Sequence, residues 1–208
     1  GAMFTGRSQS ASKAGESNQA YGVDGVFNFF GDLTAGGFYA KSHSDDIVGD
    51  EASYQAKAEW APDLYGFQVE RVKVGDAFNP EVGFLRRRAF ERSFVEGRYS
   101  PRPKNIKGIR QITFTGSVEY IEGSVTKQKE SKQQTGRINV ERENSDQFSF
   151  EAGTNYEFLP ASFNVARGVN IPAGGYDFND WTARYAFGQQ RRMSGTVQFQ
   201  KGEFYDGH

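Results

Sequence analysis

A chain of 208 residues can hold one large β domain or two small ones. Its formal net charge of -1 provides no global positive field, so nucleic acid is excluded as an expected partner. The sequence has no cysteine, which rules out disulfides, cysteine-ligated zinc and thiol catalysis.

Aromatic residues and glycine are abundant, and together they predict an all-β chain. The sequence contains 19 Phe, 10 Tyr and 25 Gly, and its apolar residues show almost no helical spacing. Mean hydropathy is -0.69, and no apolar run approaches about eighteen residues, the length of a transmembrane helix. Barrel strands need apolar residues only at alternate positions, so this low value is compatible with an outer-membrane β-barrel.

The first residues are expected to lie outside the folded domain. Gly1-Ala2-Met3 resembles the scar that tag removal leaves, and Thr5–Gln19 is rich in serine, glycine and lysine. We therefore predict a flexible arm over residues 1–19 and one antiparallel β-barrel domain, or a segment of one, over residues 20–208.

About ten strands are predicted after this arm, because runs of alternating apolar and polar residues are separated by turn-forming residues. Their ranges are Tyr21–Phe30, Thr34–Ser42, Ala52–Trp60, Gly66–Val74, Ala89–Tyr99, Arg110–Tyr120, Gly136–Arg142, Gln147–Phe158, Tyr176–Phe187 and Met193–Phe204. The polar run Thr126–Gln134 is interpreted as a solvent loop or as an extension of a strand. The expected architecture is an antiparallel up-and-down meander.

The clearest alternation lies in Gln147–Phe158. Phe148, Phe150 and Tyr156 fall on one face of an extended strand, whereas Glu151 falls on the other. The run of about twelve residues is roughly twice the length of an ordinary soluble strand and close to the length that crosses a bilayer when tilted. One face is therefore predicted to be aromatic and the opposite face polar.

Two architectures share this pattern. A soluble antiparallel β-sandwich buries one face of each sheet and is the more common protein. Long strands, alternating short and long connections, and aromatic residues near strand ends favour an outer-membrane barrel instead. These aromatic residues are Tyr21, Trp60, Tyr120, Tyr156, Phe158 and Phe187.

Four motifs resemble the DUF5916 family of bacterial proteins. They are GDAFNPEVGFLRR at Gly75–Arg87, YSPRP at Tyr99–Pro103, GVNIPAGGY at Gly168–Tyr176 and GEFYDG at Gly202–Gly207. Members of this family join an N-terminal family-9-like carbohydrate-binding domain to a C-terminal outer-membrane β-barrel. The resemblance implies that this chain is an excised segment of such a barrel, located in the bacterial outer membrane and linked to saccharides.

Few residues can carry catalytic or metal chemistry, and no catalytic residue, metal site or cofactor is predicted. His43 is the only histidine away from the C-terminus, and a polar loop is a poor place for a catalytic triad. His43 with Asp45 and Asp46 can reach a metal only from one loop, which is weak evidence for a site. Glu81 and Glu91 serve glycoside hydrolysis only at a separation that the sequence does not give.

An arginine cluster is the one candidate binding feature. Arg86, Arg88, Arg92 and Arg98 share one strand parity, with Glu81 nearby as an acidic partner. Arginines on a barrel wall pair with acids across strands, bind anions or sugar acids, or contact lipopolysaccharide phosphate. We predict that this face points inward and that its arginines mostly pair with acids of neighbouring strands.

Three functions remain open at this point. The first is an outer-membrane barrel segment that passes, binds or anchors something at the cell surface, with outer-membrane lipid or detergent as partner and a saccharide as possible ligand. The second is a soluble β-sandwich that binds carbohydrate. The third is part of a glycoside-hydrolysing protein, suggested only by the companion domain of the family.

Overall fold

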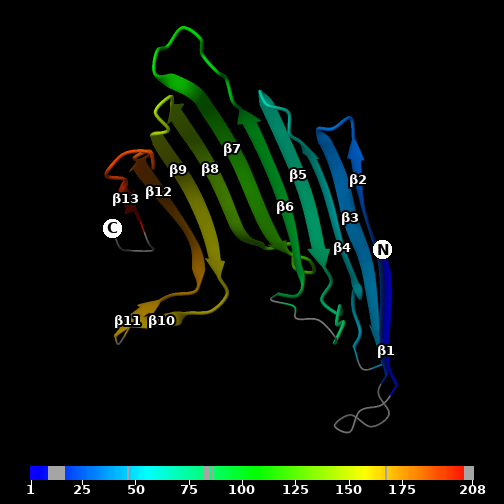
Figure 1. Ribbon diagram of the computed structural model, residues 1–208. Coiled ribbons are helices and arrows are strands. Elements are labelled where there is room, and N and C mark those ends of the chain that lie inside the picture. The colour runs from blue at the N-terminus through cyan, green and yellow to red at the C-terminus, as the bar shows by residue number, and fades with distance from the viewer. Residues whose placement is uncertain (9–16, 46, 82–84, 86, 167, 204–208) are drawn as a thin grey trace. The chain divides into compact units, whose positions relative to one another are not determined.

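The computed structural model describes residues 1–8, 17–45, 47–81, 85, 87–166 and 168–203. Eleven strands form one antiparallel sheet in the order β1-β2-β3-β4-β5-β6-β7-β8-β9-β12-β13, and β10 and β11 form a separate hairpin (Figure 1). The strands are β1 (Ala2–Arg7), β2 (Asn18–Phe29), β3 (Leu33–Ser44), β4 (Ala52–Trp60), β5 (Tyr65–Val74), β6 (Phe90–Tyr99), β7 (Ile109–Gly123), β8 (Lys129–Arg142), β9 (Gln147–Leu159), β10 (Phe163–Ala166), β11 (Val169–Ile171), β12 (Gly174–Ala186) and β13 (Thr196–Gly202). None of the described residues forms a helix that is long and apolar enough to cross a membrane.

The predicted antiparallel meander is therefore confirmed, whereas its closure into a barrel is not seen. In the described part of the chain, β1 and β13 are the two edges of an open sheet. The chain divides into two compact units. The N-terminal unit comprises Gly1–Trp60, Gln68–Phe94 and Ile121–Lys129, and the C-terminal unit comprises Ala61–Phe67, Val95–Tyr120 and Glu130–His208.

The flexible arm predicted over residues 1–19 is wrong at both of its described ends. Residues 2–7 form β1, which pairs with β2 from Ala2↔Val23 to Arg7↔Asn18. The alternation in this stretch is too short to detect in the sequence. Backbone pairing with a long neighbouring strand stabilises it, since each paired residue satisfies main-chain donors and acceptors.

Several strand boundaries also differ from the sequence prediction, most of them by one to three residues. The polar run before Gly136 belongs to β8, which begins at Lys129, so the strand-extension alternative is the correct one there. The last predicted strand begins at Thr196 rather than at Met193. Polar residues are accepted in these strands because β pairing depends on the backbone and on the neighbouring strand more than on intrinsic propensity.

Unbroken register carries the alternation across the C-terminal unit. β9 pairs with β8 from Gln147↔Glu141 to Glu157↔Ser131. Every β12 residue from Gly174 to Ala186 pairs with β9. Without a bulge, one parity stays on one face of all four strands β8, β9, β12 and β13. The predicted separation of Phe150 from Glu151 is confirmed, since Phe150 stacks on Trp181 at 6.1 Å whereas Glu151 binds Arg137.

The aromatic face is the more exposed face in both units. Phe148 and Phe150 are 39% and 38% exposed, although Ser149 and Glu151 on the opposite face of β9 are half-buried. In the N-terminal unit Phe27 on β2 is 62% exposed. Polar side chains on the opposite parity, Asn18, Ser42 and Ser53, are buried.

Apolar burial is correspondingly small. The described residues include few buried apolar side chains, namely Ala20, Val74, Ala77, Phe78, Leu159 and Ile171. A soluble domain gains most of its stability by burying large apolar side chains. Here many large apolar side chains remain on the surface and few are buried, which is the reverse of that arrangement.

Asp146 joins two turns at one end of the C-terminal unit. Its buried carboxylate accepts hydrogen bonds from Gly188 N at 2.8 Å, Tyr185 Oη at 2.7 Å and Asn144 Nδ2 at 3.0 Å. Arg191 adds an ion pair at 2.6 Å. The Gly188 N–H first, and then the Tyr185 hydroxyl, hold the pKa of Asp146 below its usual value of 3.8, against the opposing effect of burial.

We predict that Asp146 makes the fold sensitive to acid. The folded-state pKa is lower than the unfolded one, so the stabilisation is complete above about pH 4 and is lost as pH falls through the folded pKa. Asp146→Asn is expected to lower the free energy of unfolding at pH 7. It is also expected to make that free energy less dependent on pH below pH 4. Denaturant unfolding between pH 7 and pH 3 measures both effects, and parallel acid curves for the two proteins would contradict this assignment.

Candidate functional site

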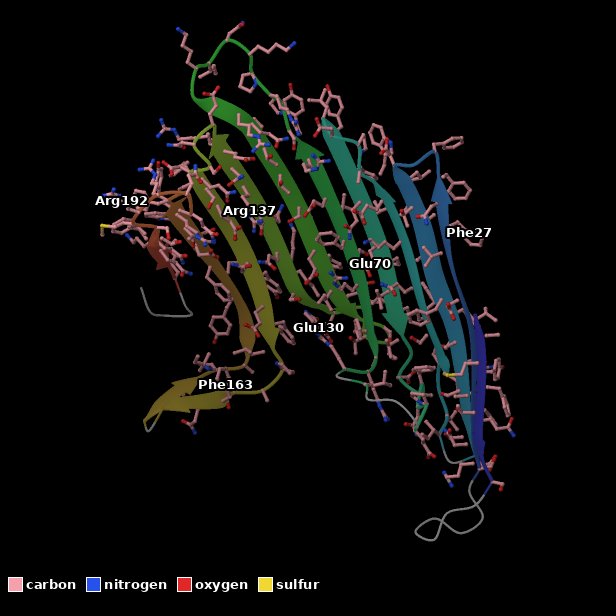
Figure 2. The ribbon with its side chains drawn as sticks, in the orientation of Figure 1. Phe27, Glu70, Glu130, Arg137, Phe163 and Arg192 are labelled. Atoms are coloured by element: carbon pink, nitrogen blue, oxygen red, sulfur yellow. The ribbon has the colours of Figure 1, made fainter. Side chains whose placement is uncertain are left out.

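The predicted pairing with an acid of a neighbouring strand is found for Arg92, whereas Arg88 and Arg98 bond to an amide oxygen and to backbone carbonyl oxygens. Arg92 on β6 donates through Nη1 to Glu70 Oε2 on β5 at 2.8 Å, and Gln55 on β4 donates to Glu70 as well. Arg92 and Glu70 are only 27% and 12% exposed at the side chain, and Glu70 is labelled in Figure 2. The Arg92 guanidinium also lies 5.4 Å from the centre of the Phe94 ring. Gln55, Glu70 and Arg92 thus form a chain of side-chain hydrogen bonds across β4, β5 and β6.

Among the described residues, Arg98 has no acidic hydrogen-bond partner. Its two terminal nitrogens donate to the carbonyl oxygens of Pro62, Asp63 and Tyr65 at 2.5, 3.0 and 3.1 Å, and to Ser100 Oγ at 2.7 Å. A Cβ on Gly66 would lie 2.8 Å from Arg98 Nε, so glycine leaves room for the side chain to cross β5. Arg98 therefore holds the connection between β4 and β5.

The other predicted binding residues lie in or beside the loop between β5 and β6. Arg88 donates to Asn79 Oδ1 at 2.9 Å. Glu81 accepts two hydrogen bonds from Arg7 of β1, at 2.6 and 2.9 Å. Arg86 lies outside the described residues. Glu81 thus attaches the loop to β1, whereas Arg88 makes a contact within the loop.

The start of the same loop is fixed on the polar face of β2 and β3. Phe78 is buried, and its neighbour Asn79 donates its backbone N–H to Ser42 Oγ at 2.7 Å. Asn18 Nδ2 donates to the Asn79 carbonyl oxygen at 2.8 Å. The described start of the motif, Gly75–Glu81, therefore packs against buried polar side chains, which gives this part of the motif a structural role.

A second ion-pair cluster was missed by sequence reasoning. Glu91, only 8% exposed at the side chain, binds Arg71 of β5 and lies 2.6 Å from Lys127 Nζ. Arg71 also contacts Ser93 and lies 3.8 Å from Glu122. The signal in the sequence is that Arg71 interrupts the parity of apolar residues on β5. Its partners are distant in sequence, so alternation alone does not identify them.

No group of three potential metal ligands occurs within the described residues. The His43 Nδ1 atom lies 2.8 Å from a Glu51 carboxylate oxygen, and Nε2 lies 3.9 Å from Asp45 Oδ1. Asp46, the third residue of the possible loop site, lies outside the described residues. His43 is therefore seen in contact with two carboxylates.

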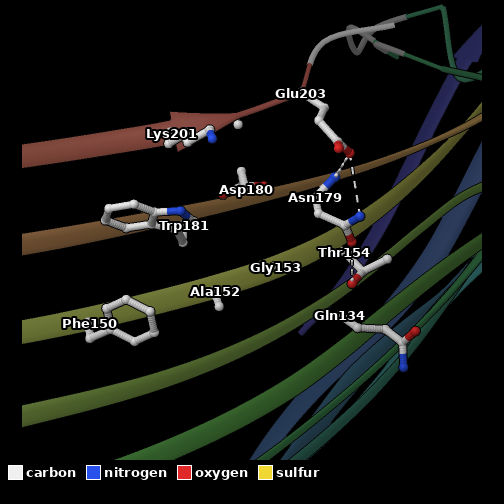
Figure 3. Close-up of a pocket in the computed structure, with 11 residues that line it drawn as sticks. Gln134, Phe150, Ala152, Gly153, Thr154, Asn179, Asp180, Trp181, Lys201 and Glu203 are labelled. Atoms are coloured by element: carbon white, nitrogen blue, oxygen red, sulfur yellow. Dashed lines mark hydrogen bonds between the residues drawn. The ribbon is translucent and has the colours of Figure 1, made fainter. Parts of the chain in front are cut away.

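The two faces of the C-terminal unit carry different pockets. On the polar face, a pocket of about 510 Å³ contains the Arg137–Glu151 ion pair among threonine, serine and amide side chains. On the aromatic face, an open pocket of about 670 Å³ lies beside Phe150 and Trp181 (Figure 3). The polar pocket can exchange hydrogen bonds with a hydrated ligand, whereas the aromatic pocket also offers ring surfaces for stacking.

We predict that Arg92 and Glu70 stabilise the fold as a pair. Arg92→Gln is expected to cost about 1–3 kcal/mol, because it leaves a half-buried carboxylate without its charge-assisted hydrogen bond. Adding Glu70→Gln is expected to recover part of that loss, since both charges are then removed. Unfolding of the two single variants and the double variant measures the coupling, and strictly additive losses would contradict the pairing.

We also predict that Arg98 stabilises the β4–β5 connection through its forked geometry. Arg98→Lys is expected to cost about 1–3 kcal/mol although it keeps the charge, because an ammonium cannot match the fork of a guanidinium. Arg102→Gln is the matched control, since the exposed Arg102–Asp63 pair contributes only about 0–1 kcal/mol. Loss of anion or oligosaccharide affinity without a change in unfolding would instead assign Arg98 to a binding site.

Comparisons with protein-family models, curated proteins and solved structures find no match to this chain. The resemblance to DUF5916 therefore stays an expectation based on the four motifs. Function has to be argued from the arrangement of side chains on the two faces of the sheet.

Proposed function

We propose that this chain is a segment of an outer-membrane β-barrel, with its aromatic face toward lipid and its polar face toward the barrel interior. The proposed location is the bacterial outer membrane. The role is passage, binding or anchoring of a component at the cell surface, linked to saccharides.

One observation carries the proposal: large aromatic side chains are more exposed than the polar side chains of the opposite face. Trp60 and Trp181, the two tryptophans of the chain, are 45% and 38% exposed on the aromatic parity. Exposed apolar surface on this scale is costly in water and favourable in hydrocarbon. Contact with the hydrocarbon of a bilayer therefore explains the exposed aromatic face, whereas contact with water does not.

The polar face supports the interior assignment. Its charges are matched locally, as in Arg92–Glu70 of the N-terminal unit and Arg137–Glu151 of the C-terminal unit. Paired charges are tolerated on the wall of a water-filled interior, whereas an arginine at the middle of the lipid face costs about 2–4 kcal/mol. The aromatic parity also contains Arg71, Glu91 and Glu122, and together with Lys127 of the neighbouring turn these charges cancel near strand ends.

Strand length is consistent with the same assignment. β7, β8, β9 and β12 contain 15, 14, 13 and 13 residues. A tilted strand of about 9–11 residues crosses a bilayer, so each of these strands is long enough to span and to extend beyond it. The backbone groups on the two open edges need further strands for pairing, as expected if the segment belongs to a larger barrel.

The alternatives lack comparable support in the described residues. A β-sandwich needs a second sheet over the aromatic face, but the described residues form no other sheet than the short β10–β11 hairpin. A glycoside hydrolase needs one carboxyl group kept protonated beside a second. Glu81 and Glu91, the pair considered from the sequence, are each bound by arginine or lysine.

We predict that both tryptophans contact acyl chains. In vesicles of phosphatidylcholine with brominated acyl chains, fluorescence of Trp60 and Trp181 is expected to be quenched, because bromine quenches only by contact within the hydrocarbon. Single-tryptophan variants made with Trp60→Phe or Trp181→Phe report each site separately.

The control places a tryptophan on the polar face. Ser149→Trp, in a chain that carries Trp60→Phe and Trp181→Phe, is expected to escape quenching by brominated lipid and to be quenched by aqueous iodide. If the chain stays monodisperse without detergent, and iodide alone quenches the natural tryptophans, the membrane assignment is overturned.

A further inference from the structure

The aromatic pocket of the C-terminal unit lies where apolar side chains give way to polar ones. Two rows of side chains across β8, β9, β12 and β13 are apolar, namely Val140, Phe148, Tyr185 and Val197, and Ile138, Phe150, Ala183 and Phe199. The next row contains Gly136, Ala152, Trp181 and Lys201. The row after it is polar and contains Gln134, Thr154, Asn179 and Glu203.

Small residues at this boundary create the hollow. Ala152 and its neighbour Gly153 are smaller than the side chains around them. They form the bottom of the pocket, and the rings of Phe150 and Trp181 line its side (Figure 3). The two rings are stacked at 6.1 Å with an interplanar angle of 28°. A flat, partly apolar ring can therefore lie against the exposed surface of Trp181.

The polar side of the hollow is already ordered by hydrogen bonds. Thr154 Oγ1 donates to Asn179 Oδ1 at 3.1 Å, and the Asn179 backbone N–H donates to Glu203 Oε2 at 3.1 Å. Within the described part of the chain, Gln134 and Lys201 make no side-chain hydrogen bond or ion pair. The hollow thus offers an amide, an ammonium and the remaining carboxylate oxygen to a ligand.

The charges around the hollow favour a neutral ligand. Lys201 is the one cation and Glu203 the one carboxylate among the lining side chains of this face, because Asp180 has the opposite parity and accepts a hydrogen bond from Asn155 Nδ2. A phosphate group would meet one negative charge beside the one positive charge, so the hollow offers a phosphate no net attraction. Hydroxyl groups can donate to the carboxylate and accept from the amide and the ammonium, which suits a sugar.

We propose that this hollow binds the neutral sugar headgroup of a glycolipid. The sugar ring stacks on Trp181, its hydroxyl groups bond to Gln134, Lys201 and Glu203, and the acyl chains follow the apolar rows past Phe150. The inference rests on the proposed function, because it requires the aromatic face to contact lipid. Beyond lipid contact, it requires that one site on this face binds a sugar headgroup in preference to other headgroups.

The test is a competition between lipids read out at each tryptophan. The protein is reconstituted in brominated phosphatidylcholine that contains increasing fractions of unbrominated monoglucosyl diacylglycerol. A chain with Trp60→Phe reports on Trp181, and a chain with Trp181→Phe reports on Trp60 as the matched control. We expect the glycolipid to replace phosphatidylcholine at Trp181 about tenfold more readily than at Trp60, as one or two good polar contacts provide.

Variants separate the sugar contacts from the fold. Gln134→Leu removes an amide that has no described partner, and it is expected to lower the preference at Trp181 several-fold while unfolding stays unchanged. Lys201→Met is expected to have a smaller effect, because the ligand is neutral. Equal protection of Trp181 by phosphatidylglycerol would overturn the sugar assignment in favour of an anionic headgroup.

The remaining outcomes distinguish the two proposals. Quenching of both tryptophans by brominated lipid, with equal glycolipid preference at both, would reject the headgroup site and leave the membrane assignment intact. Absence of quenching at both tryptophans would reject the membrane assignment and the glycolipid site with it.

Discussion

Continuous antiparallel pairing is the constraint on which the other features of this protein depend. In the C-terminal unit, β9 pairs with β8 and with β12 without a bulge, and β12 pairs with β13 in the same way. A slip of one residue would move every side chain of a strand to the other face. Because no slip occurs, single alternating patterns add up to one aromatic face and one polar face. Each unit thus presents two surfaces with opposite solvent preferences.

Charged residues follow from this division of faces. An arginine on a crowded polar face needs an acceptor, and the nearest acceptors belong to the adjacent strand or to a connection at its end. Arg92 donates a hydrogen bond to Glu70, whereas Arg98 donates to three backbone carbonyl groups. The chemistry of these arginines is therefore used for holding strands and turns in place. Buried Asp146 has the same role for two turns of the C-terminal unit.

The boundary between apolar and polar rows is a distinctive location on the aromatic face of the C-terminal unit. Along most of β9 the side chains on this face are aromatic or aliphatic, but Thr154 begins a polar row that continues to Asn179. A membrane has the same sequence of environments, from hydrocarbon to headgroup. The hollow beside Trp181 lies at that transition, which is why we connect it to a headgroup rather than to an acyl chain.

Alternation in the sequence was sufficient to predict the all-β class, the antiparallel meander and the faces of residues such as Phe150 and Glu151. These properties depend on the period of two in an extended strand, which is local. The sequence did not reveal β1, because a short strand is defined by the edge with which it pairs. It also did not reveal that Arg71 and Lys127 both bind Glu91, or that Arg98 binds carbonyl groups. These contacts join residues distant along the chain, so only the register between strands and the course of the connections decided them.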